Sequence, residues 1–241
     1  MKKIKFFFPA IAIFFCMSFV SAQNADEVIS NYINAIGGKD VISQITSIYM
    51  EGNMEAMGSQ GTMKTTLLNG KGFKQEIDVM GTQVVMCYTD SMGWQINPMT
   101  GNYNAEVMTE AQYRPGREQI YAGGLLMTDY AAKGYKLDYA GVETVGMASA
   151  HKLNMTSPDS TETAYYFDPQ TWYLIKMVQK AEMMGQTMDI SVNLSNYQKP
   201  ENGFAMPYSI ETNYGGQFFL TANFNKVEIN NPVDPVVFAK P

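Results

Sequence analysis

The chain has 241 residues, which is enough for one large all-β domain or two small ones. Its 23 acidic residues outnumber its 17 basic residues, so the formal net charge is −6 at pH 7. The phosphates of nucleic acid would be repelled by this charge, and no run of basic residues offers a site for an anionic membrane. The composition therefore argues against nucleic-acid binding and against attachment to anionic lipid by charge.

The first 22 residues have the three-part plan of a secretory signal peptide. Lys2, Lys3 and Lys5 precede an apolar run, Phe6–Val20, which is shorter than the ~20 residues of a membrane-spanning helix. Small residues lead to Ala22, so we expect cleavage after Ala22, export to the periplasm and no permanent membrane anchor. An uncleaved anchor is the alternative. Without this segment the chain keeps 14 basic and 23 acidic residues, a formal charge of −9.

Cysteine usage argues against an internal disulfide. Once the signal peptide is removed, Cys87 is the only cysteine of the chain. Its neighbours Val85, Met86 and Tyr88 indicate a buried thiol that acts as a small hydrophobic side chain. A catalytic Cys87 would need a histidine partner, and the chain has a single histidine.

Two short helices are predicted at the start of the exported chain. The apolar residues of Ala25–Ile36 fall on one helical face, and Gly37-Gly38 ends that helix. Lys39–Ile45 predicts a second, shorter helix. Apolar and polar residues then alternate over Ile48–Ala56, which predicts the first strand, and β-hairpins follow as far as Tyr88.

The hairpin turns share one form. Met57-Gly58, Met80-Gly81 and Met184-Gly185 each place a glycine after a methionine at the end of a strand. We expect the glycine to be the first residue of a two-residue turn, where a positive φ is required. The intervals between the three turns are unequal, which argues against a solenoid or a propeller.

The only other helical pattern lies between the two β-rich halves, in Ala105–Lys133. It is interrupted by Pro115-Gly116 and by Gly123-Gly124, so we expect two or three short helices. Short helices in this position are typical of a lid over a sheet, and glycines allow a lid to move at low steric cost.

The β pattern resumes after Gly134 and continues almost to the end of the chain. In Thr161–Tyr197 three strands are separated by turns, and the third alternates Met188, Ile190, Val192 and Leu194 with polar residues. A last hairpin joins Phe204–Asn213 to Gln217–Ile229, and the tail, Pro232–Phe238, suits a short edge strand.

These elements predict a fold that is mainly β with helices (α+β). We expect about ten or eleven antiparallel strands in a single strongly curved sheet or unclosed barrel, covered by short helices. No linker divides the chain, so residues 23–241 are expected to form a single domain.

Candidate catalytic and metal-binding residues are few. His151 is the only histidine, and it shares its side of the strand Ala150–Thr156 with Leu153 and Met155. This position indicates a packed or pocket-lining histidine. No zinc motif, G-x-S-x-G, P-loop or paired-carboxylate motif occurs. We therefore expect no enzyme, no catalytic residue, no metal and no cofactor.

Methionine is the unusual feature of the composition. Seventeen of the nineteen methionines follow the signal peptide, and many fall on the expected inner faces of strands. Methionine is flexible and polarizable, which suits a surface that repacks around varied apolar ligands, although ordinary core filling is the alternative for each one. The candidate residues of an apolar ligand cavity are Met50, Met54, Met63, Phe73, Trp94, Met155, Tyr165, Phe167, Met177, Met188, Ile190 and Phe218.

Several phrases occur in an order that is found in a known family. They are VISNYINAIGG at Val28–Gly38, ITSIYMEG at Ile45–Gly52, GWQINPMTG at Gly93–Gly101, YYFDPQTWYLIK at Tyr165–Lys176 and GFAMPYSIET at Gly203–Thr212. Over nearly the whole exported chain this order resembles the periplasmic lipoprotein-carrier (LolA/LolB-like) superfamily, in particular its uncharacterised outer membrane lipoprotein-sorting relatives. The resemblance implies an unclosed antiparallel barrel whose concave apolar face is covered by helices and holds acyl chains.

One departure from that family concerns arginine. The best-known carriers use a buried arginine to hold the lid closed. The only arginines here are Arg114 and Arg117, which flank Pro115-Gly116 in the expected lid, and the sequence matches neither of them to that role.

Three classes of function remain open at this point. The first is a periplasmic carrier or binding protein for lipid or lipidated protein, acting as a monomer and possessing no nucleic-acid partner. The second is an envelope protein–protein interaction module whose core is filled by its own side chains. The third is a hydrolase whose site leaves no motif in the sequence.

Overall fold

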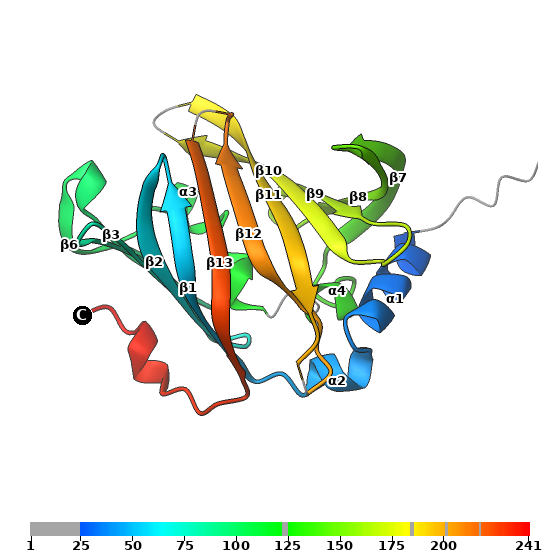
Figure 1. Cartoon of the computed structure of the whole chain (residues 1–241), viewed down its shortest axis with the longest axis horizontal. Helices are drawn as coiled ribbons and strands as arrows, with labels where there is room; N and C mark the ends of the chain where they lie inside the picture. Colours follow the sequence, from blue (N-terminus) through cyan, green and yellow to red (C-terminus); the bar gives the residue numbers. More distant parts are fainter. Residues whose placement is uncertain (1–24, 122–124, 184–185, 201, 217) are drawn as a thin grey trace, which may run out of the picture.

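The computed structural model describes residues 25–121, 125–183, 186–200, 202–216 and 218–241 (Figure 1). The expected signal peptide, with its cleavage after Ala22, lies outside the described residues, as does the turn at Met184-Gly185. Within the described ranges, no helix combines the length and the apolar character that crossing a membrane requires.

A single antiparallel sheet of thirteen strands dominates the described part of the chain, in the order β6-β5-β4-β3-β2-β1-β13-β12-β11-β10-β9-β8-β7. The strands are β1 (Ser47–Ala56), β2 (Ser59–Leu68), β3 (Gly72–Val79), β4 (Thr82–Thr89), β5 (Gly93–Asn97), β6 (Asn102–Val107), β7 (Lys136–Val145), β8 (Ala148–Thr156), β9 (Glu162–Phe167), β10 (Leu174–Met183), β11 (Gln186–Gln198), β12 (Met206–Tyr214) and β13 (Phe218–Ile229). The pairing of β1 with β13 joins the N-terminal and C-terminal meanders at the centre. The sheet is open, with β6 and β7 at its edges, which confirms the expected fold class.

The helices are short. They are α1 (Ala25–Ala35), α2 (Lys39–Ser43), α3 (Glu110–Tyr113) and α4 (Leu125–Thr128), with 3-10 turns η1 (Pro98–Thr100), η2 (Arg117–Ile120) and η3 (Pro235–Phe238). In Figure 1, α1, α2 and α4 gather near the lower ends of β11 and β12, and the C-terminal η3 lies on the other side of the molecule.

Three expectations about the secondary structure are wrong. The chain from Ala105 to Val107 was expected to be helical but belongs to β6, because Val107 and Glu106 pair with Trp94 and Gln95 of β5. The described sheet also has thirteen strands, more than the ten or eleven that we expected. The tail was expected to be an edge strand, but it forms η3, with Asp234 accepting a hydrogen bond from the backbone of Val236 at 3.0 Å.

The two-residue turns also differ from expectation. Met57 and Gly58 have φ of 51° and 77°, and Met80 and Gly81 have φ of 53° and 81°. A positive φ at both central residues defines a type I′ turn, whose backbone twist matches that of the flanking strands. The methionine therefore takes the first turn position and the glycine the second, whereas we expected the glycine first.

The main core lies between the helices and one face of the sheet, and we call this face the inner face. The helix α1 buries Val28, Ile29, Tyr32 and Ile33 against it, as the helical periodicity predicts. The ring of Tyr32 meets that of Phe167 edge-on, with centroids 5.2 Å apart. Burial of these apolar side chains holds α1, α2 and α4 on the strands of the C-terminal half.

A second core lies on the opposite, outer face of the sheet. The side chain of Phe238 packs on Gly72, where a Cβ atom would come within 2.5 Å of its ring. The indole Nε1 of Trp94 donates a hydrogen bond of 2.8 Å to the carbonyl of Phe238, and Cys87 packs in the same cluster. The C-terminal segment therefore covers the outer face of β3 to β5.

Candidate ligand-binding face and its lid

Three apolar clusters lie on the inner face in the described part of the chain, and they differ in what covers them. One of them lies at the base of the lid and is formed by Tyr88, Met108 and Ile120. The largest cluster joins α1, α2 and α4 to the strands, and it contains Met155, Tyr165 and Phe167, which are 2%, 6% and 0% exposed. These three predicted cavity residues pack in a helix-covered core.

Another cluster, which we call the strand cluster, consists of Met54, Met63, Ile77, Ala222 and Phe224. Its members come from β1, β2, β3 and β13, and no helix residue belongs to it within the described part of the chain. Partly buried residues around it are Met50, Ala56, Val79, Val84, Met86, Tyr208, Ile210, Leu220 and Val227. In the described part of the chain this stretch of the inner face is formed by strand residues without helix residues, and it is the candidate ligand-binding face.

A buried polar side chain adjoins the strand cluster. Thr65 of β2 is 1% exposed, and its Oγ1 has no hydrogen-bond partner among the described residues. It pairs across the sheet with Met50 on one side and Gln75 on the other. The Nε2 of Gln75 donates only a weak contact of 3.5 Å to the sulfur of Met63. Thr65 and Gln75 therefore place polar groups within an apolar face.

Thr65 was missed in the sequence. The alternation of β2 does place it on the side of Met63, so the signal existed. A threonine in a strand is unremarkable, however, and only the packing reveals that its hydroxyl is buried without a partner.

The lid is the segment from Met108 to Tyr121, which contains α3 and η2. One set of contacts joins it to the N-terminal half of the sheet. The hydroxyl of Tyr113 donates to the carbonyl of Thr89 at 2.8 Å, and the backbone N–H of Gly70 donates to the carbonyl of Ile120 at 2.7 Å.

Gly116 lets the lid backbone lie close to the sheet. A Cβ atom at this position would lie 2.2 Å from the ring of Tyr88. That ring lies between Phe73 and Tyr113, with centroids 6.3 Å from each. Burial raises the pKa of Tyr88 to about 12, with a smaller contribution from Tyr214. The predicted residue Phe73 thus contacts both the main core and the base of the lid.

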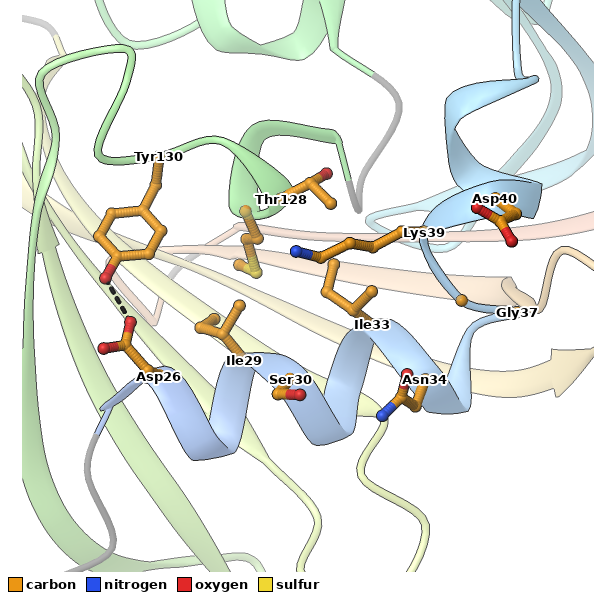
Figure 2. A pocket seen from close by; sticks show the side chains of 12 residues that line it. Asp26, Ile29, Ser30, Ile33, Asn34, Gly37, Lys39, Asp40, Thr128 and Tyr130 are labelled. Atoms are coloured by element: carbon orange, nitrogen blue, oxygen red, sulfur yellow. Dashed lines mark hydrogen bonds between the residues drawn. The ribbon is translucent and has the colours of Figure 1, made fainter.

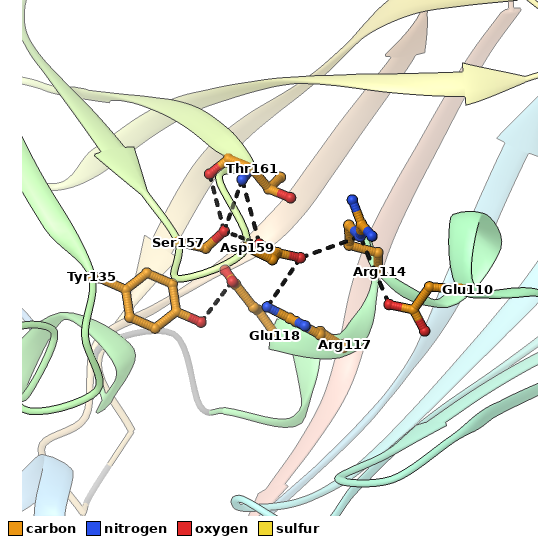
Figure 3. A network of polar contacts seen from close by, with 8 residues as sticks. All are labelled: Glu110, Arg114, Arg117, Glu118, Tyr135, Ser157, Asp159 and Thr161. Atoms are coloured by element: carbon orange, nitrogen blue, oxygen red, sulfur yellow. Dashed lines mark hydrogen bonds and ion pairs between the residues drawn. The ribbon is translucent and has the colours of Figure 1, made fainter.

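A second set of contacts joins the lid to the β8–β9 loop and the start of β7 (Figure 3). The carboxylate of Asp159 lies 3.3 Å from Nε of Arg114 and 3.2 Å from Nη2 of Arg117. The hydroxyl of Tyr135 donates to Glu118 at 2.6 Å. The two arginines therefore bridge the lid to the C-terminal half of the sheet, a role that the sequence by itself did not assign to them.

We call the contacts of Asp159 with Arg114 and Arg117 the latch. The pKa values of Asp159 and of the neighbouring Glu118 are shifted by their surroundings. Burial acts to raise the pKa of Asp159, but hydrogen bonds from Ser157 and Thr161 together with the charge of Arg117 hold it below its usual range. Burial raises the pKa of Glu118, against the opposing effects of the Tyr135 hydrogen bond and the Arg117 charge. Asp159 is thus held as an anion between two cations.

The remaining predicted residues are dispersed. Met50 packs against the main core and the strand cluster and Met177 against the main core, and both are partly buried. Met188 and Ile190 lie half-buried on β11. Phe218 begins β13, but its side chain lies outside the described residues.

Trp94 is the predicted cavity residue that the structure corrects. It belongs to the outer-face cluster beneath the C-terminal segment, where its indole is 3% exposed. Its register partner Cys87 shares that face. The expectation that Trp94 lines the inner face is therefore wrong, because the tail covers the outer face and makes an aromatic residue favourable there.

His151 is packed on aromatic neighbours. Its ring stacks on Trp172 with centroids 5.2 Å apart, and its Nδ1 lies 3.1 Å from the hydroxyl of Tyr139. Within the described ranges no cluster of three or more His, Cys, Asp or Glu side chains is arranged to hold a metal ion.

Two hollows lie away from the lid. One, of about 480 Å³, opens between α1, α2 and α4, where Tyr130 donates a hydrogen bond of 2.6 Å to Asp26 (Figure 2). The other, of about 460 Å³, adjoins the strand cluster at Met54 and Gly61 and is otherwise lined by polar residues of β1, β2 and β13. Neither hollow gathers a catalytic constellation.

The comparisons with known proteins concern the fold. No protein-family model and no curated protein sequence matches the chain. Among solved structures, it is similar to a domain assigned to outer membrane lipoprotein sorting from Vibrio parahaemolyticus, with 12% identity and a TM-score of 0.60 over 90% of this chain and 98% of that one. It is also similar to a LolA superfamily protein from Nitrosomonas europaea, with 10% identity and a TM-score of 0.59 over 90% and 98% of the chains.

A third similar structure is a DUF1329 family protein from Desulfovibrio piger, with 12% identity and a TM-score of 0.57 over 89% of this chain and 97% of that one. All three likenesses extend over most of the chain. The chain therefore has the fold of the LolA-superfamily and outer membrane lipoprotein-sorting domains, as its sequence pattern indicated.

Proposed function

We propose that the protein is a periplasmic carrier or binding protein for acyl chains, either of lipid or of lipidated protein, and that it acts without covalent chemistry. The observation that carries the proposal is the strand cluster, an apolar stretch of the inner face that contains no helix residue within the described part of the chain. The lid, held to both halves of the sheet, supplies a means to close over a bound chain.

The composition of the strand cluster suits a variable apolar guest. Met54 and Met63 have unbranched side chains that can change rotamer without a change in the backbone. Burial of apolar area contributes about 25 cal/mol per Å² before ordering costs. A ligand that buries a few hundred Å² would on this basis bind with roughly micromolar affinity without any polar contact.

Thr65 and Gln75 add a polar element to the proposed site. A buried hydroxyl without a partner is unfavourable by about 1–3 kcal/mol, and a ligand that accepts its hydrogen bond removes this penalty. The carbonyl of an ester or amide is such an acceptor, and acyl chains in lipids and lipoproteins carry one. The proposed ligand therefore places its acyl carbonyl near Thr65 and its alkyl chain along the methionines.

Lid opening is the proposed route of entry. Arg114 and Arg117 keep part of their side chains in solvent, although the Asp159 oxygen that they share is buried, so each pair should contribute on the order of 1 kcal/mol. Separation of Asp159 from Arg114 and Arg117 would thus remove the ion pairs on one side of the lid at modest cost, so that the Tyr135–Glu118 hydrogen bond has still to break there. The core beneath α1 would stay intact.

Two measurements on the purified exported chain test the proposal. Mass spectrometry of an organic extract should identify a co-purified lipid, and a fluorescent fatty-acid probe should bind and be displaced by that lipid. Ala222→Trp, which fills the strand cluster, should lower probe affinity at least tenfold, because the indole occupies the volume of the alkyl chain.

The matched control is Thr221→Trp, which places the same indole on the opposite face of β13 and should leave probe binding unchanged. Failure of the probe to bind the native chain would reject the carrier. Equal loss in the two variants would reject the proposed location.

An interaction module with a self-filled core is the second candidate. It is favoured by the burial of Met54 and Met63, which are each 3% exposed and pack among side chains of the chain itself. A protein that purifies without lipid, binds no probe and retains an envelope protein on an affinity column would favour this candidate. Export remains part of the proposal for both, and an intact mass beginning at Gln23 would support it.

A further inference from the structure

Three turns at one end of the strands, distinct from the edge strands β6 and β7, each expose a methionine. Met57 in the β1–β2 turn is 74% exposed, Met80 in the β3–β4 turn is 85% exposed, and Met99 in η1 between β5 and β6 is 77% exposed. Because successive antiparallel strands reverse direction, these alternate turns lie at the same ends of the strands. We call this set the methionine edge.

The backbone at the methionine edge disfavours the residue it carries. Met57 and Met80 have φ of 51° and 53°, in the left-handed region that favours Gly, Asn and Asp. Asn-Gly is the preferred sequence of a type I′ turn, so asparagine would form the same turn with less strain. Folding gains nothing from the methionine in return, because its side chain projects into solvent.

A fourth turn shows that an exposed methionine does not require this strain. Met147 in the β7–β8 turn is fully exposed, but there Gly146 takes the first position with φ of 62°, and Met147 does not have a positive φ. This turn lies at the opposite end of the strands, because β7 is seven places from β1 in an antiparallel sheet and therefore runs in the opposite direction.

The methionine edge is continuous with the strand cluster. Met57 follows Ala56, and Met80 follows Val79, and both Ala56 and Val79 pack against the strand cluster. An apolar path therefore runs from exposed turn to inner face at two adjacent hairpins.

Charge identifies the kind of surface that fits. Residues 53–62, 77–84 and 95–104 contain no lysine or arginine, and their acidic residues are Glu55 and Asp78, each two positions from a tip methionine. The Oδ1 of Asp78 accepts a hydrogen bond of 3.0 Å from the backbone of Gly81, which holds its carboxylate at the turn. Exposed methionines flanked by carboxylates complement a surface that has an apolar interior and exposed ammonium groups. The same carboxylates are repelled by an anionic surface.

We propose that the methionine edge docks on the surface of a zwitterionic phospholipid bilayer, with Met57, Met80 and Met99 inserted among the acyl chains and Glu55 and Asp78 beside headgroup ammonium groups. This interaction goes beyond the binding of a single acyl chain on the inner face. Docking brings the methionine edge, which adjoins the strand cluster, against the bilayer from which a ligand is taken or to which it is released.

Flotation of the purified exported chain with vesicles tests the proposal. The native chain should float with vesicles of phosphatidylcholine and phosphatidylethanolamine, and replacement of part of the lipid by phosphatidylglycerol should lower the bound fraction. The test variant is Met57→Asn with Met80→Asn, which keeps both turns and relieves their strain. Its partition onto zwitterionic vesicles should fall by about tenfold for each methionine removed.

The matched control is Met147→Asn, which makes the same chemical change at an equally exposed residue at the opposite end of the strands and should float like the native chain. Binding of the fatty-acid probe in the absence of vesicles should be equal in all three proteins, so a failure of docking is distinguishable from a failure of the proposed carrier function. Size-exclusion chromatography with light scattering on the same samples should show no change of oligomeric state.

Three outcomes would overturn the proposal. They are an absence of native protein from the floated fraction, an equal loss on Met147→Asn, and binding that rises with anionic lipid. A native chain that self-associates in solution, when the Met57→Asn, Met80→Asn variant is monomeric, would instead assign the methionine edge to contacts between copies of this chain.

Discussion

Asp159 Oδ2 lies 3.2 Å from Arg117 Nη2, and this pair joins the lid to the β8–β9 loop at the far side of the inner face. Arg114 approaches the same oxygen at 3.3 Å, and Ser157 donates a hydrogen bond to the other carboxylate oxygen. One carboxylate thus holds two lid cations. Loss of this one carboxylate would therefore remove both ion pairs of the latch, while the Tyr135–Glu118 and Tyr113–Thr89 hydrogen bonds of the lid would remain.

Asp159→Asn should loosen the lid without unfolding the protein. The amide keeps the oxygen that bonds the Thr161 backbone but loses the charge, so the free energy of unfolding should fall by about 1 kcal/mol or less. Dissociation of the fatty-acid probe, measured by stopped-flow fluorescence, should accelerate several-fold. The matched control is Glu110→Gln, which removes a carboxylate that pairs with Arg114 at 3.7 Å on the outside of the latch, and it should change neither quantity. A probe that leaves both variants at the native rate would contradict the latch.

The latch should also weaken in acid. The folded-state pKa of Asp159 is depressed, so its contribution to stability is present above the unfolded-state pKa and is lost as the pH falls through the folded-state pKa. The pKa of the neighbouring Glu118 is raised, so its contribution has the opposite sign and is lost as the pH rises. Probe dissociation measured in acid should therefore accelerate in the Glu118→Gln protein as the pH falls. The acceleration should be absent when Asp159→Asn is added, and its persistence there would assign the effect to another group.

Thr65→Val should stabilise the protein without ligand. The substitution keeps the side-chain shape and removes a buried hydroxyl that has no partner among the described residues, so the free energy of unfolding should rise by about 1 kcal/mol. The variant should also lose any preference for an acyl ester over an alkane of equal length in probe displacement. Thr66→Val, on the outer side of the same strand, is the control and should leave that preference intact. A destabilised Thr65→Val protein would mean that the hydroxyl has a partner.

Gly116→Ala should prevent the lid from seating. The backbone φ of Gly116 is −99°, which alanine adopts freely, so the effect would come from the contact of the new Cβ with the ring of Tyr88. Such overpacking costs about 1–3 kcal/mol, and we expect a lower free energy of unfolding and faster probe dissociation. The double variant Gly116→Ala, Tyr88→Leu removes part of the ring and should recover the closed lid. Equal dissociation rates in the single and double variants would reject this packing as the cause.

Much of the fold follows from local patterns. Alternation over Ile48–Ala56 and the helical face of Ala25–Ile36 are both present in the structure, because period and side-chain polarity are set by residues close in sequence. Met57-Gly58 and Met80-Gly81 were located correctly as turns. Their type was not, because a glycine signals a positive φ nearby without saying which turn position it takes.

The candidate site depended on contacts between distant parts of the chain. Alternation placed Met54 and Met63 on one face, but the face occupied by Trp94 was decided by η3, which arrives from the C-terminus and covers it. Nothing local in Arg114 or Arg117 indicates Asp159 as their partner, and nothing local in Thr65 indicates that its hydroxyl is buried. The sequence by itself determined which residues alternate and where the chain turns. Only the tertiary structure decided which face is covered and which charges meet, because burial and ion pairing depend on segments that the fold brings together from far apart in the chain.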